Sequence, residues 1–141
     1  MMTYTQPLIG IVFVWAGFVC AISFMEAWLK FRAPGVTLPV GLSIGRLVFS
    51  ALNKVEWSFA LVSVFLIIYG GNHQGLSPVF LLLPVLLLLQ TTWLLPAMNK
   101  RAELVIAGAE VSRSSLHFYY IGAELLKLVL LVMFGIQLFH P

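Results

Sequence analysis

Four runs of predominantly apolar residues constrain this chain more than any other feature. They cover residues 7–29, 44–69, 78–98 and 114–139. A helix needs about 20 apolar residues to cross the hydrocarbon core of a bilayer, and each run reaches that length. The runs and their connectors use up all 141 residues. We therefore predict an all-α integral membrane protein, a single domain built as a bundle of four transmembrane helices.

Composition excludes a soluble protein. The chain is 61% hydrophobic, only 9% charged and without a single Asp. Its mean hydropathy is +1.03, which a soluble domain of this size could not carry on its surface. The basic residues lie at the ends of the apolar runs rather than in one patch, which is not the pattern of a nucleic-acid-binding surface. The expected partner is the lipid bilayer, and nucleic acid is not an expected partner.

The distribution of basic residues predicts the orientation. The N-terminal tail, the second connector and the C-terminal end contain no Lys or Arg. The first and third connectors contain all the bases that flank the runs closely: Lys30, Arg32, Arg46, Lys100, Arg101 and Arg113. Basic loops stay on the cytoplasmic side of a membrane. Both termini are therefore expected on the non-cytoplasmic side of a multi-pass protein, which in a bacterium means the periplasmic side of the inner membrane.

The last run carries ionisable groups into the bilayer. His117, Tyr120, Glu124 and Lys127 follow one another at i, i+3, i+7 and i+10, which places them on one stripe of a helix. A charged group inside a bilayer costs at least about 2.5 kcal/mol, so such groups normally face the interior of a bundle. The stripe is therefore either a brace that holds helices together or a working site.

A second stripe of polar residues occurs on the second run. Arg46, Asn53 and Glu56 lie at i, i+7 and i+10, the same spacing logic as in the last run. Glu26, near the end of the first run, has Lys30 four residues later and is expected to pair with it at the membrane interface.

Counting along straight helices brings polar residues of all four runs to one depth. At 1.5 Å per residue, Cys20, Glu56, Gln90 and Glu124 each lie about 20 Å from the outer end of a core about 30 Å thick. We predict a polar pocket at this depth, open to the cytoplasmic side. The candidate ligand-binding residues are Arg46, Asn53, Glu56, Gln90, His117, Tyr120, Glu124 and Lys127.

The connectors and helix faces give further expectations. Residues 33–45 contain two Pro and three Gly and are expected to form an irregular interfacial loop, and residues 99–113 a partly helical connector. The Leu-rich third run is expected to be the helix most exposed to lipid.

The first run contains two pairs of small residues spaced four apart, Ala16/Cys20 and Gly17/Ala21. Such pairs allow close helix approach, so this face is expected to point inward. The apolar outer faces favour a homo-oligomer, a dimer or a trimer.

Three segments of the chain support a family comparison: KFRAPGVTLPVGLSIGRLVFSALNKVEW at 30–57, LLPAMNKR at 94–101 and SRSSLHFYYIGAELLKLVLL at 112–131. Together they resemble the pattern of the transmembrane protein 205-like family of small four-pass membrane proteins. The resemblance covers most of the chain and contains no catalytic signature. It implies the four-helix architecture, and it implies neither a reaction nor site residues.

A shorter element of the second run is Asn53-x-x-Glu56, with Arg46 upstream. It resembles the N-x-x-E element of the MAPEG family of trimeric four-helix membrane enzymes. This resemblance implies a trimer that uses glutathione near the cytoplasmic side. The third run lacks the basic residue that the family pattern includes.

Three classes of function follow from these residues. The buried groups form a site that binds or moves a proton, an ion or a small amphipathic solute, or they brace an accessory or assembly subunit, or the chain is a MAPEG-like enzyme that acts on a lipophilic substrate. A metal site is not predicted, because there is no Glu-x-x-His pair and no second His at ligand spacing. No cofactor is identified by the residues alone.

Overall fold

The computed structural model describes residues 2–71, 73–111 and 115–140, and these residues form helices and turns without strands. Four helices are long and apolar enough to cross a membrane: Tyr4–Arg32, Leu38–Tyr69, Pro78–Ile106 and Leu116–Phe139. The first consists of α1 (Met2–Val19), the π-helical turn η1 (Cys20–Glu26), α2 (Ala27–Leu29) and η2 (Lys30–Arg32). The second is α3 (Leu38–Tyr69), followed by the short turn η3 (His73–Leu76). The third joins α4 (Pro78–Leu89), the π-helical turn η4 (Gln90–Leu94) and α5 (Leu95–Ile106), and the fourth is α6 (Leu116–Phe139).

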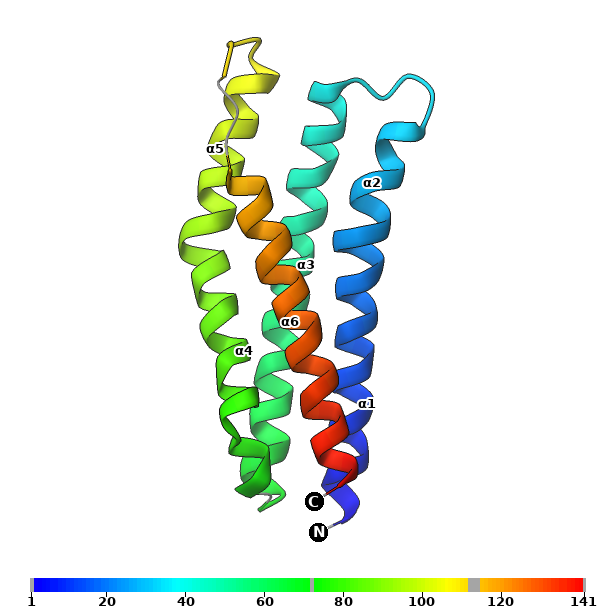
Figure 1. Cartoon of the computed structure of the whole chain (residues 1–141), viewed down its shortest axis with the longest axis vertical. Coiled ribbons are helices and arrows are strands. Elements are labelled where there is room, and N and C mark those ends of the chain that lie inside the picture. Colours follow the sequence, from blue (N-terminus) through cyan, green and yellow to red (C-terminus); the bar gives the residue numbers. More distant parts are fainter. Residues whose placement is uncertain (1, 72, 112–114, 141) are drawn as a thin grey trace.

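The helices run alternately up and down in one elongated bundle (Figure 1). The first helix packs against α3 and α6, and the third helix packs against the same two on the other side. Both termini lie at one end of the bundle, which we call the terminal end. Connector residues 33–37 and 107–111 lie at the opposite end, which we call the connector end. Arg113, one of the connector bases that predicts orientation, is outside the described residues.

The first connector is shorter than predicted. Residues 33–45 were expected to be irregular, yet α3 begins at Leu38 and only 33–37 form the loop. Pro39 occupies the first turn of the helix, where its missing N–H and fixed φ are favourable. Gly41 and Gly45 lie on the buried face, and added Cβ atoms there would meet the side chains of Phe31 and Lys30. These glycines therefore permit close helix packing instead of breaking the helix.

The third helix also differs in part from expectation. The stretch 99–113 is partly helical, as predicted, because α5 continues to Ile106 before a turn at Gly108, whose φ is +85°. The prediction that this Leu-rich helix is the most exposed is confirmed only in part, because its most apolar window is 28% buried, the lowest share of the four, and the second helix has the same share.

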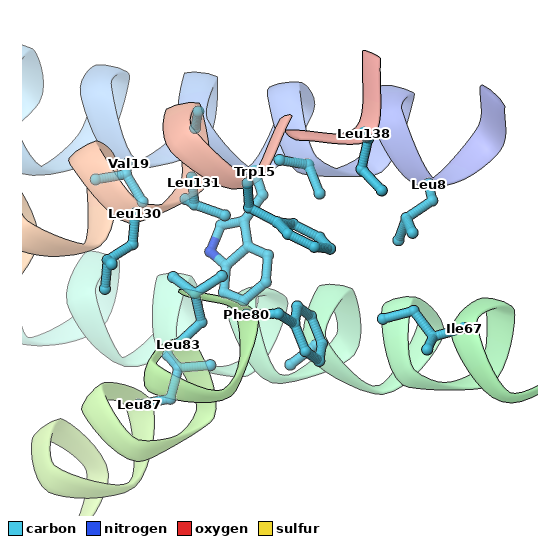
Figure 2. Close-up of a cluster of buried hydrophobic side chains, with 14 residues drawn as sticks. Leu8, Trp15, Val19, Ile67, Phe80, Leu83, Leu87, Leu130, Leu131 and Leu138 are labelled. Atoms are coloured by element: carbon cyan, nitrogen blue, oxygen red, sulfur yellow. The ribbon is translucent and has the colours of Figure 1, made fainter. Parts of the chain in front are cut away.

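An apolar core fills the half of the bundle nearer the terminal end (Figure 2). Its fully buried members come from every helix: Leu8, Val12, Trp15 and Val19 of α1, Ile67 of α3, Phe80, Leu83 and Leu87 of α4, and Leu131 and Phe134 of α6. The rings of Phe80 and Phe134 lie 5.1 Å apart at their centroids.

Large side chains occupy the inward face of α1. Ala16 is buried as predicted, whereas Gly17 and Cys20 are exposed, so the expected small-residue face does not line the interior. The interior is filled by Trp15 and its apolar neighbours, which bury more surface than small residues could.

Candidate functional site

Lys127 lies at the centre of a buried charged cluster. Its Nζ donates to Glu124 Oε1 at 2.6 Å and to Glu56 Oε1 at 2.9 Å, and it forms an ion pair with Glu56 Oε2 at 2.7 Å. The three side chains are 0% to 2% exposed. An ammonium group has three protons, and Lys127 donates one of them to each of the two carboxyl groups. We call this group the Glu56–Lys127–Glu124 triad.

Three uncharged side chains also donate hydrogen bonds to the two carboxylates. Trp15 Nε1 donates to Glu56 Oε2 at 3.0 Å. Ser23 Oγ donates to Glu124 Oε2 at 2.5 Å, and Gln90 Nε2 donates to Glu124 Oε1 at 2.5 Å. Each of the four membrane-length helices therefore contributes at least one side chain to the triad or its donors.

Local helix geometry explains how these side chains meet. Glu124 and Lys127 are three residues apart on α6 and share one face. Glu56 lies on the buried stripe of α3, between Leu52 and Ala60 at helical spacing. Ser23 and Gln90 belong to the π-helical turns η1 and η4. Such turns are rare and often occur at functional sites, and here both supply donors to the same carboxylate.

The charges of the triad do not cancel. With all three groups ionised, two carboxylates face one ammonium and the triad carries a net charge of −1. An uncompensated charge excluded from water is costly, and two carboxylates that share a site resist simultaneous ionisation. One additional proton on either carboxyl group would neutralise the cluster.

The structure brings together five of the eight predicted site residues. Glu56, Gln90, Glu124 and Lys127 form the cluster itself. Tyr120 is buried one turn before Glu124 on the same face of α6, and its ring lies edge-on to that of Phe49 with 5.0 Å between centroids. The predicted stripe on α6 is therefore correct from Tyr120 onward.

His117 is not part of the cluster. It lies in the first turn of α6, where its side chain is exposed and its ring lies beside that of Phe118. The burial of α6 begins at Tyr120, one turn later. The prediction that His117 shares the polar layer is wrong.

Asn53 belongs to a second, partly buried polar cluster between α3 and the third helix. Its Oδ1 lies 3.1 Å from Thr91 Oγ1, and Trp57 Nε1 donates to the same hydroxyl oxygen at 2.9 Å. Thr91 Oγ1 also lies 2.6 Å from the carbonyl oxygen of Leu87. The side chain of Asn53 therefore forms a hydrogen bond with Thr91 and does not face Glu124.

Arg46 forms an ion pair near the connector end. Its guanidinium lies 2.7 Å from Glu103 Oε1, with the two side chains 34% and 61% exposed. The pair links the first turns of α3 to α5. The predicted stripe on the second helix thus divides into three environments, and only Glu56 reaches the triad.

The first helix contributes residues that the sequence analysis missed. Cys20, predicted to lie in the polar layer, is exposed, and Trp15 and Ser23 take its place. Trp15 could have been predicted from the sequence as a donor to the polar layer, because a buried indole N–H normally finds an acceptor. The Glu26 and Lys30 pair is confirmed, with 3.9 Å between Oε2 and Nζ.

Within residues 2–71, 73–111 and 115–140, no group of three His, Cys, Asp or Glu side chains is placed to hold a metal ion. No family model, no curated protein and no solved structure matches this chain.

Proposed function

We propose that this chain is a multi-pass membrane protein that binds and exchanges a proton at the Glu56–Lys127–Glu124 triad. The observation that carries the proposal is the ratio of two buried carboxylates to one buried ammonium. A proton is the smallest species that neutralises the remaining negative charge, and it needs no cavity. The four apolar helices support a membrane location.

The triad lies at a depth where its net charge matters. Glu56 is 13 residues from Tyr69 and Glu124 is 15 from Phe139, which corresponds to about 20 Å from the terminal end at 1.5 Å per residue. In our proposed orientation, with the termini on the non-cytoplasmic side, the triad lies in the cytoplasmic half of the hydrocarbon core. A net charge at this depth is unfavourable, so the neutral, protonated triad is the expected resting form.

Infrared spectroscopy of the reconstituted protein tests the proposal. A protonated carboxyl group has a C=O stretch that an ionised carboxylate lacks. The wild type is expected to show this band at neutral pH, and Glu56→Gln and Glu124→Gln are expected to change or remove it. Glu103→Gln, which alters an exposed carboxylate, is the matched control and should leave the band unchanged. A wild type with no such band at neutral pH would overturn the proposal.

A second function, that of a structural brace in an accessory subunit, is favoured by one observation. Each oxygen of the two carboxylates accepts at least one hydrogen bond from protein. A brace requires no proton exchange, and its loss reduces stability only. Proton uptake by liposomes that contain the protein separates the two functions, since a brace gives no uptake above that of Glu124→Gln.

The glutathione-dependent alternative has less support from the geometry. It requires Asn53 and Glu56 to act together on one ligand. In the structure Glu56 faces Lys127 and Trp15, whereas Asn53 faces Thr91. Two separate clusters do not form a common binding surface.

A further inference from the structure

We propose that the additional proton of the triad resides on Glu124 Oε2 and is held there by a hydrogen bond to Ser23 Oγ. This inference rests on the proposed function, because it assigns the atom at which the triad binds its proton. It also gives the two carboxyl groups different roles. Glu124 is the group that exchanges the proton, and Glu56 stays ionised as the partner of Lys127.

Three of the four carboxyl oxygens contact the ammonium group of Lys127. Its Nζ lies 2.9 Å from Glu56 Oε1, 2.7 Å from Glu56 Oε2 and 2.6 Å from Glu124 Oε1. A proton bound to one of these oxygens would lie beside the cation, and a protonated oxygen is a weaker acceptor than an ionised one. The fourth oxygen is Glu124 Oε2, and its hydrogen-bond partner is the hydroxyl of Ser23. Protonation of this oxygen therefore costs the ammonium group least.

The three uncharged partners of the carboxyl groups differ in whether they can accept a hydrogen bond. The indole N–H of Trp15, on Glu56 Oε2, can only donate. Gln90 presents its amide nitrogen to Glu124 Oε1, and this group also only donates. The hydroxyl of Ser23 has one proton and two lone pairs, so it can donate to a carboxylate or accept from a carboxylic acid. Of these three contacts, all within the described residues, only that of Ser23 suits both charge states of a carboxyl group.

Proton binding reverses the direction of this hydrogen bond. In the ionised form the Ser23 O–H donates to Glu124 Oε2. An incoming proton forms the new O–H bond on Oε2, and this O–H then donates to a lone pair of Ser23 Oγ. The Ser23 proton stays on its own oxygen and turns away, since a serine in a helix can direct it at a backbone carbonyl one turn earlier. One proton is added, no bond within Ser23 breaks, and the charge of the triad changes from −1 to zero.

The geometry of the two oxygens suits this exchange. Ser23 Oγ and Glu124 Oε2 lie 2.5 Å apart, at the short end of the range for a hydroxyl that bonds an ionised oxygen. Ser23 is 9% exposed and Glu124 is 0% exposed, so water has little access to the bond. The hydroxyl of Ser23 is therefore the expected partner of Oε2 both before and after the proton binds.

The groups that face Glu124 determine what titrates with it. They are Lys127 and the buried Tyr120 of α6, Glu56 of α3, and the uncharged Ser23 and Gln90 of the first and third helices. In this set of described residues Lys127 is the only cation, and it lies between the two carboxyl groups. Loss of the proton from Glu124 leaves one ammonium shared by two carboxylates. Gain of the proton leaves Glu56 and Lys127 as a neutral pair.

Substitution of one glutamate by aspartate locates the proton, because the chain contains no Asp. In Glu124→Asp, made by cell-free synthesis with aspartate that carries carbon-13 in its side-chain carboxyl group, the label marks a single site. The infrared carboxyl band of the reconstituted variant should move to lower wavenumber on labelling. In Glu56→Asp the same label should leave the band in place. A band that moves with the label at position 56, or that ignores the label at position 124, would overturn the assignment.

Variants of Ser23 test the hydrogen bond without altering a carboxyl group. Ser23→Ala removes the acceptor of the new O–H bond, so the carboxyl C=O band should shift to higher wavenumber. Ser23→Thr keeps the hydroxyl and should retain the wild-type position of the band, which a packing defect alone would not explain. Ser63→Ala is the matched control, because this buried hydroxyl has no hydrogen-bond partner among the described residues, and the band should stay in place. An unshifted band in Ser23→Ala would overturn the assignment.

These outcomes are distinct from a failure of the proposed function. A wild-type carboxyl band that responds neither to the label at position 124 nor to Ser23→Ala leaves proton binding by the triad intact and overturns only its location on Glu124. The absence of a carboxyl band in the wild type at neutral pH would instead overturn the proposed function.

Discussion

Lys127 Nζ lies 2.7 Å from Glu56 Oε2 and thereby joins α6 to α3 across 71 positions of sequence. Both side chains are excluded from solvent. The pair is a long-range contact with unequal partners: loss of Lys127 leaves two buried carboxylates without a cation, whereas loss of Glu56 leaves Lys127 paired with Glu124. Its consequences for stability depend on which partner is removed.

Removal of the ammonium is expected to be severe. Lys127→Met leaves two carboxylates facing each other without a counter-charge, and we expect a loss of about 3 to 5 kcal/mol in the free energy of unfolding. Denaturant unfolding in detergent measures it. Lys54→Met, an exposed lysine on α3, is the matched control and should change stability by less than about 1 kcal/mol. Equal stability of the two variants would contradict a charged Lys127.

Removal of one carboxylate should cost less. Glu56→Gln and Glu124→Gln each leave one carboxylate with one ammonium, a neutral pair that requires no added proton. We expect each to be more stable than Lys127→Met by at least about 1 to 2 kcal/mol. A combined variant with Lys127→Met, Glu56→Gln and Glu124→Gln should recover most of the stability that Lys127→Met loses. The same unfolding assay decides, and an additive loss in the combined variant would argue against a charge imbalance.

The exposed Arg46–Glu103 pair is expected to contribute little. Such pairs are screened by solvent and are typically worth less than about 1 kcal/mol. Arg46→Ala should therefore leave the unfolding midpoint nearly unchanged, and added salt should not alter that result. A loss comparable with that of Lys127→Met would show that the connector end is more tightly packed than its exposure indicates.

Gly70, at the end of α3, should not tolerate a side chain. An added Cβ would lie 2.6 Å from the Leu66 carbonyl oxygen and 2.8 Å from Tyr4 Cβ, so Gly70→Ala should destabilise the protein by roughly 1 to 3 kcal/mol. Gly17→Ala is the control, since no atom lies within 4 Å of its added Cβ. Thermal unfolding of the two variants should separate them clearly.

Orientation can be measured by thiol labelling in a Cys20→Ala background. His140→Cys at the terminal end should react with an impermeant reagent added outside cells, and Ala109→Cys in the third connector should not. Both positions are exposed, so burial does not bias the comparison. The reverse pattern would invert our proposed topology.

Periodicity was sufficient to predict part of this site. Three residues of the α6 stripe point inward as expected, because a transmembrane helix keeps its polar groups away from lipid. The depth count also placed Glu56, Gln90 and Glu124 at one level, and the structure joins all three through hydrogen bonds.

Other residues could not be assigned from spacing. Asn53 and Glu56 are three residues apart, so spacing alone places them on one helix face. In the structure only Glu56 contacts Lys127, whereas Asn53 forms a hydrogen bond with Thr91. The sequence did not identify Ser23 as a site residue, because small polar residues are common in membrane helices. Its role depends on Glu124, 101 residues away, and only tertiary structure reveals that pairing.

The positions of the charges along the chain have a consequence for biosynthesis. Glu124 and Lys127 are one turn apart on α6, so the last helix carries its own counter-ion when it enters the bilayer. Glu56 is synthesised 71 residues before Lys127, and until then the nearby donor among its described partners is the indole of Trp15. A nascent chain that ends before α6 therefore holds a carboxyl group without its cation, and in the proposed membrane location this intermediate is the least stable stage of synthesis.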